Sequence, residues 1–338
     1  MSITRISSNV CKINRTRRIF PVYSLCYSHG CMGGTVLDGR RIRDEILGEL
    51  RPRVERLKSQ ARAPGLAVVL VGEDPASQIY VRSKIKASEE LGIRSVEIRA
   101  PQDITTEALL ERLQPLKEDR SVDAILVQMP LPRQIDPEAV IPRVVDQERD
   151  VDGFGAFSLG RLVLNRPGPR ACTPAGIIEM LKRYKIPMAG KKAVVVGRSD
   201  IVGKPMSLML LHENATVTIC HSRTANLAAE CRTADILVAA IGRAAMLTAE
   251  HIKPGAVVID VGMNRLRDRA EIERLFPEDH GRQAAFEKNG SVLVGDVHPR
   301  AMEDLSSAYT PVPGGVGPLT IAMLMANTVD LAEHHLGC

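Results

Sequence analysis

Lys84 and Tyr80 are the first side chains in this sequence whose types and spacing could support chemistry. They lie four positions apart in the segment 77–84, S-Q-I-Y-V-R-S-K, which has the pattern of a helix. At about 100° per residue, Lys84 falls inside the apolar arc of that helix, beside Tyr80. A lysine turned inward loses hydration, which favours its neutral form and allows it to act as a general acid or base. The alternative is a lysine that extends along its stem to solvent, and the segment taken alone favours this alternative.

Gln128 and Asp152 are polar residues that could work with such a lysine. Residues 124–128 form a short apolar strand and Pro130 follows it, so Gln128 is expected at the carboxyl end of the strand, where open α/β sheets bind ligands. Asp150 and Asp152 precede a glycine in D-V-D-G-F, which indicates a tight turn. Taken alone, Gln128 is more often a loop hydrogen-bonding residue, and capping of the turn accounts for both carboxylates.

A second group of residues could hold a phosphate. The buried strand expected at 192–197 leads into R-S-D-I-V-G-K-P and then a helix, so Gly197, Arg198 and Ser199 lie just before a helix N-terminus. Free N–H groups and the helix dipole attract anions there, although the sequence is not the G-x-G-x-x-G dinucleotide motif.

The next expected strand, 216–220, indicates which dinucleotide would bind. NAD sites place an acidic residue near the end of this strand, where it binds the ribose hydroxyls. Ser222 and Arg223 instead offer a hydroxyl and a cation at this point. This pair favours a ribose 2′-phosphate, and hence NADP over NAD, with an ordinary solvated arginine as the alternative.

Glycines follow several of the later strands and fill one late loop. Gly242, Gly262 and Gly295 each come after an apolar strand, which predicts that the backbone approaches a dinucleotide closely along one edge of a sheet. The loop 310–318, T-P-V-P-G-G-V-G-P, is too rigid for a linker, and we expect it to line a ligand. Two adjacent histidines near the end of the final helix are expected to satisfy its C-terminus rather than bind a metal.

An alternating framework of strands and helices must position these residues. Each strand is apolar on both faces, which predicts parallel sheets and an α/β fold of two domains, with 166–169 as the best linker. A helix is expected at 38–60, bent or split at Pro52, and Asp74 and Gly92 should cap the start and end of the next one. The expected strands are 66–71, 95–99, 124–128, 192–197, 216–220, 236–240, 257–261 and 292–294, and further helices are expected at 105–117, 137–145, 175–184 and 319–335.

The composition restricts the class of protein. With 338 residues, 44% of them hydrophobic, the chain can form two domains with separate cores. Five basic residues before residue 35 account for the formal net charge of +5, so the remaining chain is balanced and predicts no nucleic-acid partner. No apolar run approaches the roughly 18 residues of a membrane span. The cysteines after residue 35 lack C-x-x-C spacing, which predicts neither a metal site nor a disulfide framework.

Residues 1–34 differ in composition from the rest of the chain. They contain arginine and serine but no acidic residue. This composition fits an organellar transit peptide, and it fits equally an upstream reading that has Met32 as the true start. The foldable pattern begins only at Thr35, which favours the second interpretation. We therefore expect 1–34 to be an extension without fixed structure and the protein to be cytoplasmic, with a mitochondrial location as the alternative.

Five motifs, in this order and spacing, resemble the bifunctional methylenetetrahydrofolate dehydrogenase/cyclohydrolase family. They are Y-V-x-x-K, V-Q-M-P-L-P, D-V-D-G-F, V-V-G-R-S-x-x-V-G-x-P and P-V-P-G-G-V-G-P-L-T, and the resemblance runs from about residue 35 to the C-terminus. It implies NADP-dependent oxidation of methylenetetrahydrofolate to the methenyl compound, followed by hydrolysis to formyltetrahydrofolate. It also implies a folate domain at 35–170 plus 317–338, an NADP-binding Rossmann domain at 171–316, a cleft between them and a homodimer.

The resemblance assigns roles to individual residues. Lys84 matches the catalytic lysine of the family, Tyr80 the tyrosine that flanks the substrate and Gln128 the glutamine that hydrogen-bonds the lysine. Asp152 matches the aspartate that holds the pterin ring. The matching substrate positions are Ser77, Pro130, Gly314 and Gly315, and the matching cofactor positions are Gly197, Arg198, Ser199, Ser222 and Arg223.

Two other functions are compatible with this fold. A monofunctional dehydrogenase would keep the NADP site and lose the hydrolysis, and the intact set of Tyr80, Lys84 and Gln128 argues against it. A non-catalytic NADP-binding protein would be expected to have lost part of that set.

Overall fold

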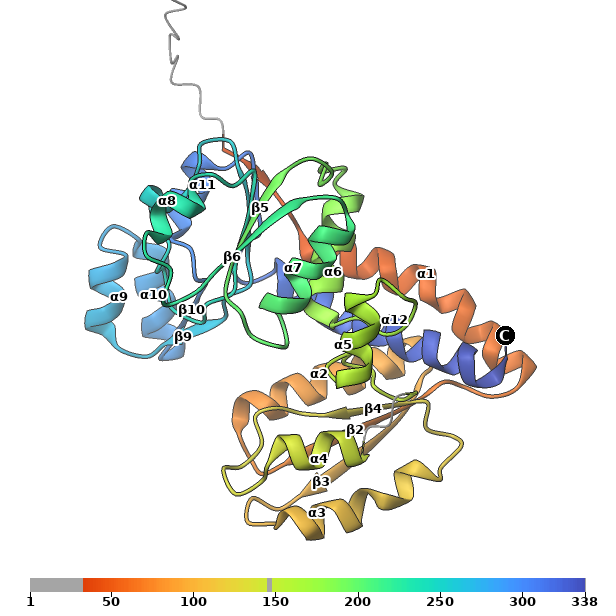
Figure 1. Cartoon of the computed structure of the whole chain (residues 1–338). Coiled ribbons are helices and arrows are strands. Elements are labelled where there is room, and N and C mark those ends of the chain that lie inside the picture. The colour runs from red at the N-terminus through yellow and green to blue at the C-terminus, as the bar shows by residue number, and fades with distance from the viewer. Residues whose placement is uncertain (1–32, 145–147, 338) are drawn as a thin grey trace, which may run out of the picture. The chain divides into compact units, whose positions relative to one another are not determined.

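Two parallel β-sheets and one short antiparallel ribbon form the framework of the chain, and Figure 1 shows the helices that surround them. The computed structural model describes residues 33–144 and 148–337. The extension predicted at 1–34 therefore lies outside the described residues as far as residue 32. The alternation of strands and helices confirms the predicted α/β fold class.

The smaller sheet has three parallel strands in the order β3-β2-β4. These strands are β2 (Gly65–Val71), β3 (Arg94–Ala100) and β4 (Ala124–Val127). Every residue of β2 and β4 is buried, whereas β3 at the edge of the sheet is mostly half-buried or exposed. The prediction of two apolar faces is therefore wrong for β3, because its sequence R-S-V-E-I-R-A alternates polar and apolar residues and so has one polar face.

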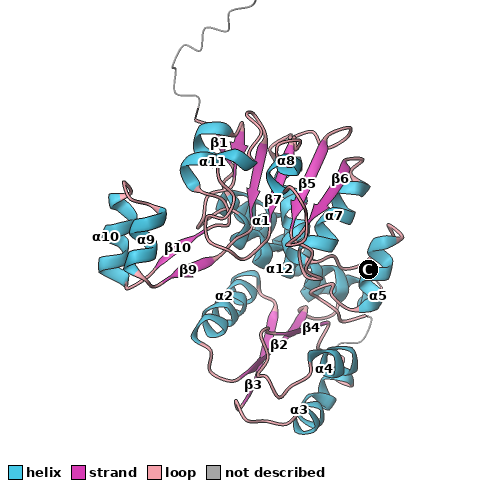
Figure 2. Ribbon diagram, turned by 60° about the vertical axis from the view of Figure 1, so that its left-hand side comes forward, coloured by secondary structure: helices cyan, strands magenta, loops and turns pink. Residues whose placement is uncertain are grey.

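Helices cover both faces of the smaller sheet, as Figure 2 shows. Alternate residues of β2 point to opposite sides, so Leu66 and Val68 join one hydrophobic core and Ala67 and Val69 join another. The first core includes α1 (Gly39–Gln60) and α2 (Pro75–Leu91), and the second includes α3 (Thr106–Leu113), the 3₁₀ helix η1 (Gln114–Lys117) and α4 (Pro137–Val144). Helix α1 continues through Pro52, so it is not split there.

The larger sheet has six parallel strands in the order β1-β11-β8-β7-β5-β6. Its strands are β1 (Thr35–Val36), β5 (Lys192–Val196), β6 (Thr216–Cys220), β7 (Ile236–Ala239), β8 (Val257–Asp260) and β11 (Ala308–Tyr309). The chain passes from β5 to β6 on one side and returns to β7 on the other, which creates a switch point at the carboxyl end of β5. Strand β1 pairs with β11, so residues 35–36 belong to this sheet although the sequence analysis assigns them to the folate domain.

The faces of the larger sheet are covered by two further sets of helices. Val195, Val238 and Ile259 share a core with α6 (Cys172–Arg183) and α7 (Gly203–His212). Val194 and Leu237 face the opposite core, which includes residues of α8 (Leu227–Cys231) and α11 (Pro299–Leu305). Two further short helices of this half of the chain are α5 (Ala156–Val163) and the 3₁₀ helix η2 (Ala249–His251).

The antiparallel ribbon lies outside both parallel sheets. It pairs β9 (Asn264–Leu266) with β10 (Val292–Val294), and Figure 2 shows α9 (Arg269–Leu275) and α10 (His280–Asn289) beside it. Gly295 therefore follows a ribbon strand. The prediction that its strand belongs to the same sheet as the strands before Gly242 and Gly262 is wrong, because strand pairing cannot be read from a short apolar run. Gly295 nevertheless lies against Asp260 at the carboxyl end of β8.

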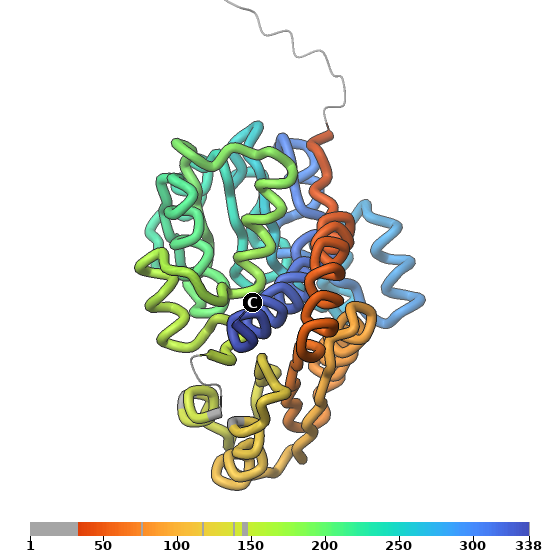
Figure 3. Tube along the Cα trace, turned by 90° about the vertical axis from the view of Figure 1, so that its right-hand side faces the viewer, coloured from red at the N-terminus to blue at the C-terminus, as the bar shows by residue number. Residues whose placement is uncertain are grey.

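The last helix, α12 (Val316–Leu336), packs against α1, α6 and α2. Figure 3 shows it beside α1, to which it is also joined by charged pairs. The Arg53 guanidinium donates to Glu333 at 2.5 and 3.1 Å and to Asp330 at 2.6 Å. The final helix is thus fixed to the first helix of the described chain by both apolar and ionic contacts.

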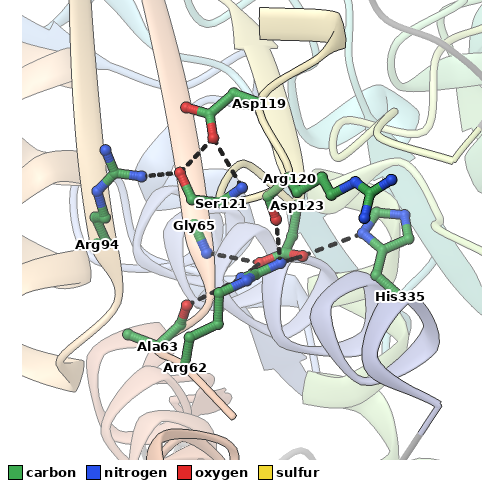
Figure 4. Close-up of polar contacts among 9 residues, drawn as sticks. All are labelled: Arg62, Ala63, Gly65, Arg94, Asp119, Arg120, Ser121, Asp123 and His335. Atoms are coloured by element: carbon green, nitrogen blue, oxygen red, sulfur yellow. Dashed lines mark hydrogen bonds and ion pairs between the residues drawn. The ribbon is translucent and has the colours of Figure 1, made fainter.

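The buried carboxylate of Asp123 contacts the C-terminal end of α12. It accepts hydrogen bonds from Arg62 at 2.7 and 2.8 Å and from the Gly65 N–H at 2.8 Å. Nδ1 of His335 lies 3.1 Å from the same carboxylate (Figure 4). His335 therefore pairs with a side chain from the small sheet, so the prediction that it serves the C-terminus of its own helix is wrong for this residue. We call this group of four residues the Asp123 cluster.

Candidate active site

Helix α2 contains Tyr80 and Lys84. The Asp74 carboxylate accepts a hydrogen bond from the Ser77 N–H at 2.7 Å and so caps the helix, and Gly92 ends it with φ of 78°. Both caps are as predicted. Because α2 begins and ends at these residues, Lys84 lies one turn beyond Tyr80 on the same helix.

Lys84 is directed to the carboxyl end of β4. Its Nζ donates to Oε1 of Gln128 at 2.9 Å, and Nε2 of Gln128 donates to the Met129 carbonyl at 2.6 Å. The backbone N–H of Gln128 continues the sheet by donating to Val69 at 2.9 Å. The lysine is therefore held by a side chain that is itself fixed at both ends, and this contact excludes the interpretation of a lysine extended to solvent.

Asp150 and Asp152 have different roles in their turn. The Asp150 carboxylate accepts from the N–H groups of Gly153, Phe154 and Gly155 at 2.8 to 3.3 Å, so the capping interpretation holds for this residue. Asp152 keeps part of its surface open. Burial raises the pKa of Asp152 to about 6, while the charge of Lys84 opposes this rise and that of Asp150 adds to it. Asp152 is thus a half-buried carboxylate whose pKa depends on the charge of Lys84.

A pocket of about 320 Å³ lies where α2 meets the loop 311–318. Tyr80 and Ile79, with 41% and 52% of their surfaces exposed, form one wall of the pocket. Gly314 and Gly315 form another. The other predicted substrate and catalytic residues are not in this lining: Ser77, Pro130, Lys84, Gln128 and Asp152. Of the two substrate positions among them, Ser77 is buried and Pro130 is exposed.

Gly315 has a steric reason to be glycine. A Cβ atom at this position would lie 2.7 Å from the carbonyl oxygen of Pro311 and 2.7 Å from Cβ of Thr310. Its N–H also donates to the Pro311 carbonyl at 2.8 Å, which closes the loop on itself. The loop is therefore rigid, as the sequence predicts, and it presents backbone to the pocket.

Three arginines at this pocket were missed by the sequence analysis. Arg40 and Arg43 come from α1, and Arg265 comes from β9. No signal in the sequence distinguishes them, because each stands in a segment that reads as an ordinary charged surface. Two of them have side-chain partners, since Arg43 donates to Asp44 at 2.6 and 2.8 Å and Arg265 donates to Ser291 at 3.0 Å.

A second pocket, of about 470 Å³, lies at the carboxyl ends of β5, β6 and β7. This is the switch point of the larger sheet, where α/β folds bind their ligands. The predicted residues Gly197, Arg198, Ser199 and Ser222 line it, and Arg223, which is exposed, is not in the lining. The structure thus brings four of the five predicted cofactor residues together.

Gly197 shows how closely the backbone packs at the second pocket. Its φ is 134°, and a Cβ atom there would lie 2.2 Å from the Ala240 carbonyl oxygen. A side chain at residue 197 would therefore displace the neighbouring strand end. The backbone is left bare beside the pocket, which fits the close approach of a dinucleotide.

Ser199 corrects one detail of the predicted phosphate site. Its Oγ accepts from the N–H groups of Val202 and Gly203, both at 3.3 Å. The sequence predicts that N–H groups at the start of α7 are free for an anion, but these two already have a partner. The Ser199 hydroxyl therefore holds this loop, and it occupies two N–H groups that the sequence predicts to be free for an anion.

Two buried carboxylates near the pockets were also missed, and one of them, Asp260, lines the first pocket. Asp260 ends β8 and Asp296 follows β10, and their exposed fractions are 1% and 0%. Burial raises the pKa of Asp260 to about 7, against the effect of its backbone hydrogen bonds, and the charge of Asp296 adds to the rise. The available signal was an acidic residue directly after an apolar strand, next to a glycine in the case of Asp296.

Two further features are absent from the described residues. Across 33–144 and 148–337, no group of three or more His, Cys, Asp or Glu side chains could hold a metal ion. No helix in the same ranges is both long and apolar enough to span a membrane.

A parallel sheet with a pocket at its switch point is joined to a second α/β unit in which a helix directs a lysine to a strand end. These features define a dinucleotide-binding enzyme of the α/β class. Comparison with known families makes this class specific. The catalytic domain of tetrahydrofolate dehydrogenase/cyclohydrolase matches residues 37–152, and the NAD(P)-binding domain of the same family matches residues 171–336. The chain belongs to the tetrahydrofolate dehydrogenase/cyclohydrolase family.

Individual relatives agree with this assignment. The bifunctional protein FolD of Solibacter usitatus is 58% identical over 302 residues, which cover 89% of this chain and 98% of the relative. The bifunctional protein FolD of Koribacter versatilis is 54% identical and covers 90% and 99% of the two chains. The resemblance stated from the sequence is thereby confirmed.

Solved structures show the same fold. The bifunctional FolD enzyme of Campylobacter jejuni is 41% identical with a TM-score of 0.79, over 89% of this chain and 99% of that chain. The FolD enzyme of Trypanosoma brucei, complexed with NADP cofactor and inhibitor, is 34% identical with a TM-score of 0.81, over 90% and 99%.

Proposed function

We propose that this enzyme oxidises methylenetetrahydrofolate with NADP and then hydrolyses the methenyl product to formyltetrahydrofolate. The observation that carries the proposal is the hydrogen bond of 2.9 Å between Lys84 and Gln128 at the carboxyl end of β4. A dehydrogenase step needs mainly alignment, which two pockets at adjoining strand ends supply. A hydrolysis step needs a proton acceptor and a proton donor, and this lysine is placed to be both.

In the hydrolysis, Lys84 would first act as the base. Water adds its oxygen to the methenyl carbon and gives up a proton to the amine. The bond from that carbon to one ring nitrogen then breaks, and this nitrogen keeps the bonding electron pair and takes a proton from the ammonium group. The hydroxyl of the intermediate releases its own proton to solvent as its carbon–oxygen bond becomes the formyl carbonyl. Gln128 would keep Nζ aimed at the reacting carbon, because its other amide end is anchored on the Met129 carbonyl.

The other predicted residues would hold the folate. Asp152 would accept N–H groups of the pterin ring through its partly open carboxylate, and Tyr80 would lie flat against the substrate from the wall of the pocket. Gly314 and Gly315 would allow close approach of the ligand to the loop. Ser77 and Pro130 are proposed as further substrate-lining positions on the same side.

The pocket at the switch point would bind NADP, which supplies the hydride acceptor. Its lining fits such a group, since bare backbone at Gly197 meets a pocket of about 470 Å³. Arg198 and Ser199 would lie along the pyrophosphate. Ser222 and Arg223 would face the 2′-phosphate of the ribose, where a hydroxyl and a guanidinium are suitable partners.

The wider setting of the enzyme is also a proposal. We propose a folate domain at 35–170 plus 317–338 and a cofactor domain at 171–316, with the β1 strand at 35–36 contributed to the sheet of the second. We further propose a homodimer, a cytoplasmic location, and no nucleic-acid partner, the last because charge is balanced after residue 35. Light scattering of the purified protein tests the homodimer. The intact mass of the native protein shows whether it carries residues 1–34, which bears on the proposed location.

The Lys84→Met variant tests the proposed function. Removal of the amine should lower methenyltetrahydrofolate hydrolysis by about 10² to 10⁴-fold, the usual contribution of a general acid or base. The dissociation constant of NADP, measured by calorimetry, should stay within about twofold. Hydrolysis at the rate of the parent enzyme would contradict the proposal.

Lys86→Met is the matched control for this experiment. Lys86 lies on the same helix, and its side chain is 76% exposed and 3.8 Å from Glu90. The same chemical change there removes a surface charge outside both pockets. The control should therefore retain both activities, so a loss confined to Lys84→Met reports the position of the amine and not the loss of a lysine from α2.

A further inference from the structure

The loop 241–243 forms one side of the pocket at the switch point and is held by a single buried carboxylate. Ile241 and Arg243 line the pocket, together with Ala240 at the end of β7. All three backbone N–H groups of the loop point away from solvent to Asp296, which is not in the lining. The loop thus owes its shape to a residue 53 to 55 positions further along the chain.

The geometry at Asp296 is complete on both oxygens. Oδ2 accepts from the N–H groups of Ile241 at 2.5 Å and Gly242 at 3.0 Å. Oδ1 accepts from the N–H of Arg243 at 2.9 Å and from Nδ2 of Asn264 at 2.8 Å. Three consecutive N–H groups directed to one anion form the kind of backbone cradle that binds phosphates elsewhere. Here the protein fills it with its own carboxylate.

The backbone of Asp296 is fixed independently of its side chain. Its N–H donates to Oδ1 of Asp260 at 2.9 Å, and the N–H of Val297 donates to Oδ2 of Asp260 at 2.9 Å. Its carbonyl accepts from the N–H of Leu247 at 2.9 Å. The carboxylate therefore has little freedom to follow the loop if the loop moves, so Asp296 sets the position of residues 241–243.

We propose that Asp296 is a positioning residue for the nicotinamide dinucleotide, acting through the backbone of residues 241–243. This inference rests on the proposed function of the second pocket. With the carboxylate in place, the loop presents its side chains and carbonyl groups to the cofactor. Without it, three partly buried N–H groups lose their acceptor, and the loop loses the contact that fixes its shape beside the pocket.

Asp296→Asn in the full-length protein is the first test. The amide keeps the shape of the side chain, but it presents N–H groups to two of the four donors. We expect the NADP dissociation constant, measured by calorimetry, to rise at least tenfold. Hydrogen exchange of the amides of residues 241–243 should accelerate in the ligand-free variant. Hydrolysis of methenyltetrahydrofolate in the absence of NADP should stay within twofold, because it does not use the second pocket.

Asp123→Asn is the matched control. Asp123 is equally buried, accepts from a backbone N–H and from side chains, and lies in the smaller sheet. This variant should lose stability and bind NADP with an unchanged dissociation constant. A purely structural role for Asp296 predicts the same result for both variants.

A second variant decides the question if Asp296→Asn does not fold. Asn264→Ala removes the side-chain donor to Oδ1 and a longer bond of 3.4 Å to the Val294 carbonyl, and Asn264 is half-buried on the ribbon. We expect NADP binding to weaken about threefold with hydrolysis unchanged.

Two results would overturn the inference. One is unchanged NADP affinity in whichever of the two variants folds. The other is an equal loss of NADP binding and NADP-independent hydrolysis, which would make Asp296 a general stabilising residue. A parent enzyme that binds no NADP would instead contradict the proposed function, so the two failures are distinguishable.

Discussion

Two aspartates, Asp123 and Asp152, lie near opposite ends of strand β4, and their carboxylates have different surroundings. Asp123 directly precedes the strand and is fully buried, with Arg62, the Gly65 N–H and His335 around its carboxylate. Asp152 lies in a turn that bridges to β4 in parallel, through Ile125 and Asp150, and so reaches toward the carboxyl end of the strand. It remains partly open.

The difference between the two carboxylates separates a structural charge from the one that we propose to bind the substrate. At Asp123 the opposite charge and the hydrogen bonds are supplied by the protein, and the carboxylate in turn raises the pKa of the Arg62 guanidinium. At Asp152 burial is the largest influence and lifts the pKa to about 6, with the Lys84 charge only partly offsetting it. A compensated group gains nothing from a ligand, whereas a desolvated one gains from each hydrogen bond that a substrate donates.

Asp123→Ala should give the largest effect on stability. The substitution leaves the buried Gly65 N–H without its acceptor and Arg62 without its charged partner, so we expect a loss of about 3 kcal/mol in the free energy of unfolding. Urea unfolding measures this loss. The KM values of the folded fraction for both substrates should stay unchanged, and a rise in the folate KM would show that the Asp123 cluster is not purely structural.

Asp152→Asn should have the opposite signature. The amide removes the ionised acceptor, and we expect kcat/KM for methenyltetrahydrofolate to fall about thirtyfold, or about 2 kcal/mol. The free energy of unfolding at pH 8 should rise. The raised pKa means that ionisation of Asp152 destabilises the folded state progressively as pH increases from about 4 to about 6, and the amide does not ionise. A variant that is both less stable and fully active would reverse the comparison.

The position of the catalytic set could be predicted from local patterns. Asp74 and Gly92 define α2, and an apolar run followed by proline places Gln128 at a strand end, so the two elements that meet at Lys84 were available from the sequence. Their meeting itself was not, because Lys84 and Gln128 are 44 residues apart and periodicity carries no information on contacts at that distance. The resemblance to a family supplied that step.

The contacts that could not be predicted are those between distant segments. Asp123 and His335 are 212 residues apart, and each reads locally as an ordinary residue at the end of its element. Strand β10 looks the same in the sequence as a strand of the main sheet, yet it pairs with β9, and this pairing delivers Asp296 to residues 241–243. Buried polar contacts of this kind depend on topology, which short apolar strands leave undetermined.

The pH dependence of hydrolysis should show the open carboxylate directly. The profile of kcat/KM reports groups of the free enzyme, and Asp152 in its ionised form is the proposed acceptor for the pterin. We expect kcat/KM to fall about tenfold for each pH unit below about 6, the pKa of Asp152. This fall of kcat/KM at acidic pH should disappear in Asp152→Asn. An unchanged acidic limb in that variant would assign it to another group.

His335→Leu should give the smallest effect and tests how far the Asp123 cluster depends on its most distant member. The histidine is half-buried and makes a single contact of 3.1 Å with Asp123, whereas Arg62 makes two shorter ones and remains in the variant. Since the carboxylate keeps its cation and its backbone donor, we expect a loss of at most about 1 kcal/mol in urea unfolding, with no change in either KM. A loss as large as that of Asp123→Ala would mean that the stability of the Asp123 cluster depends on the packing of α12 against it. It would then not depend mainly on charge compensation by Arg62.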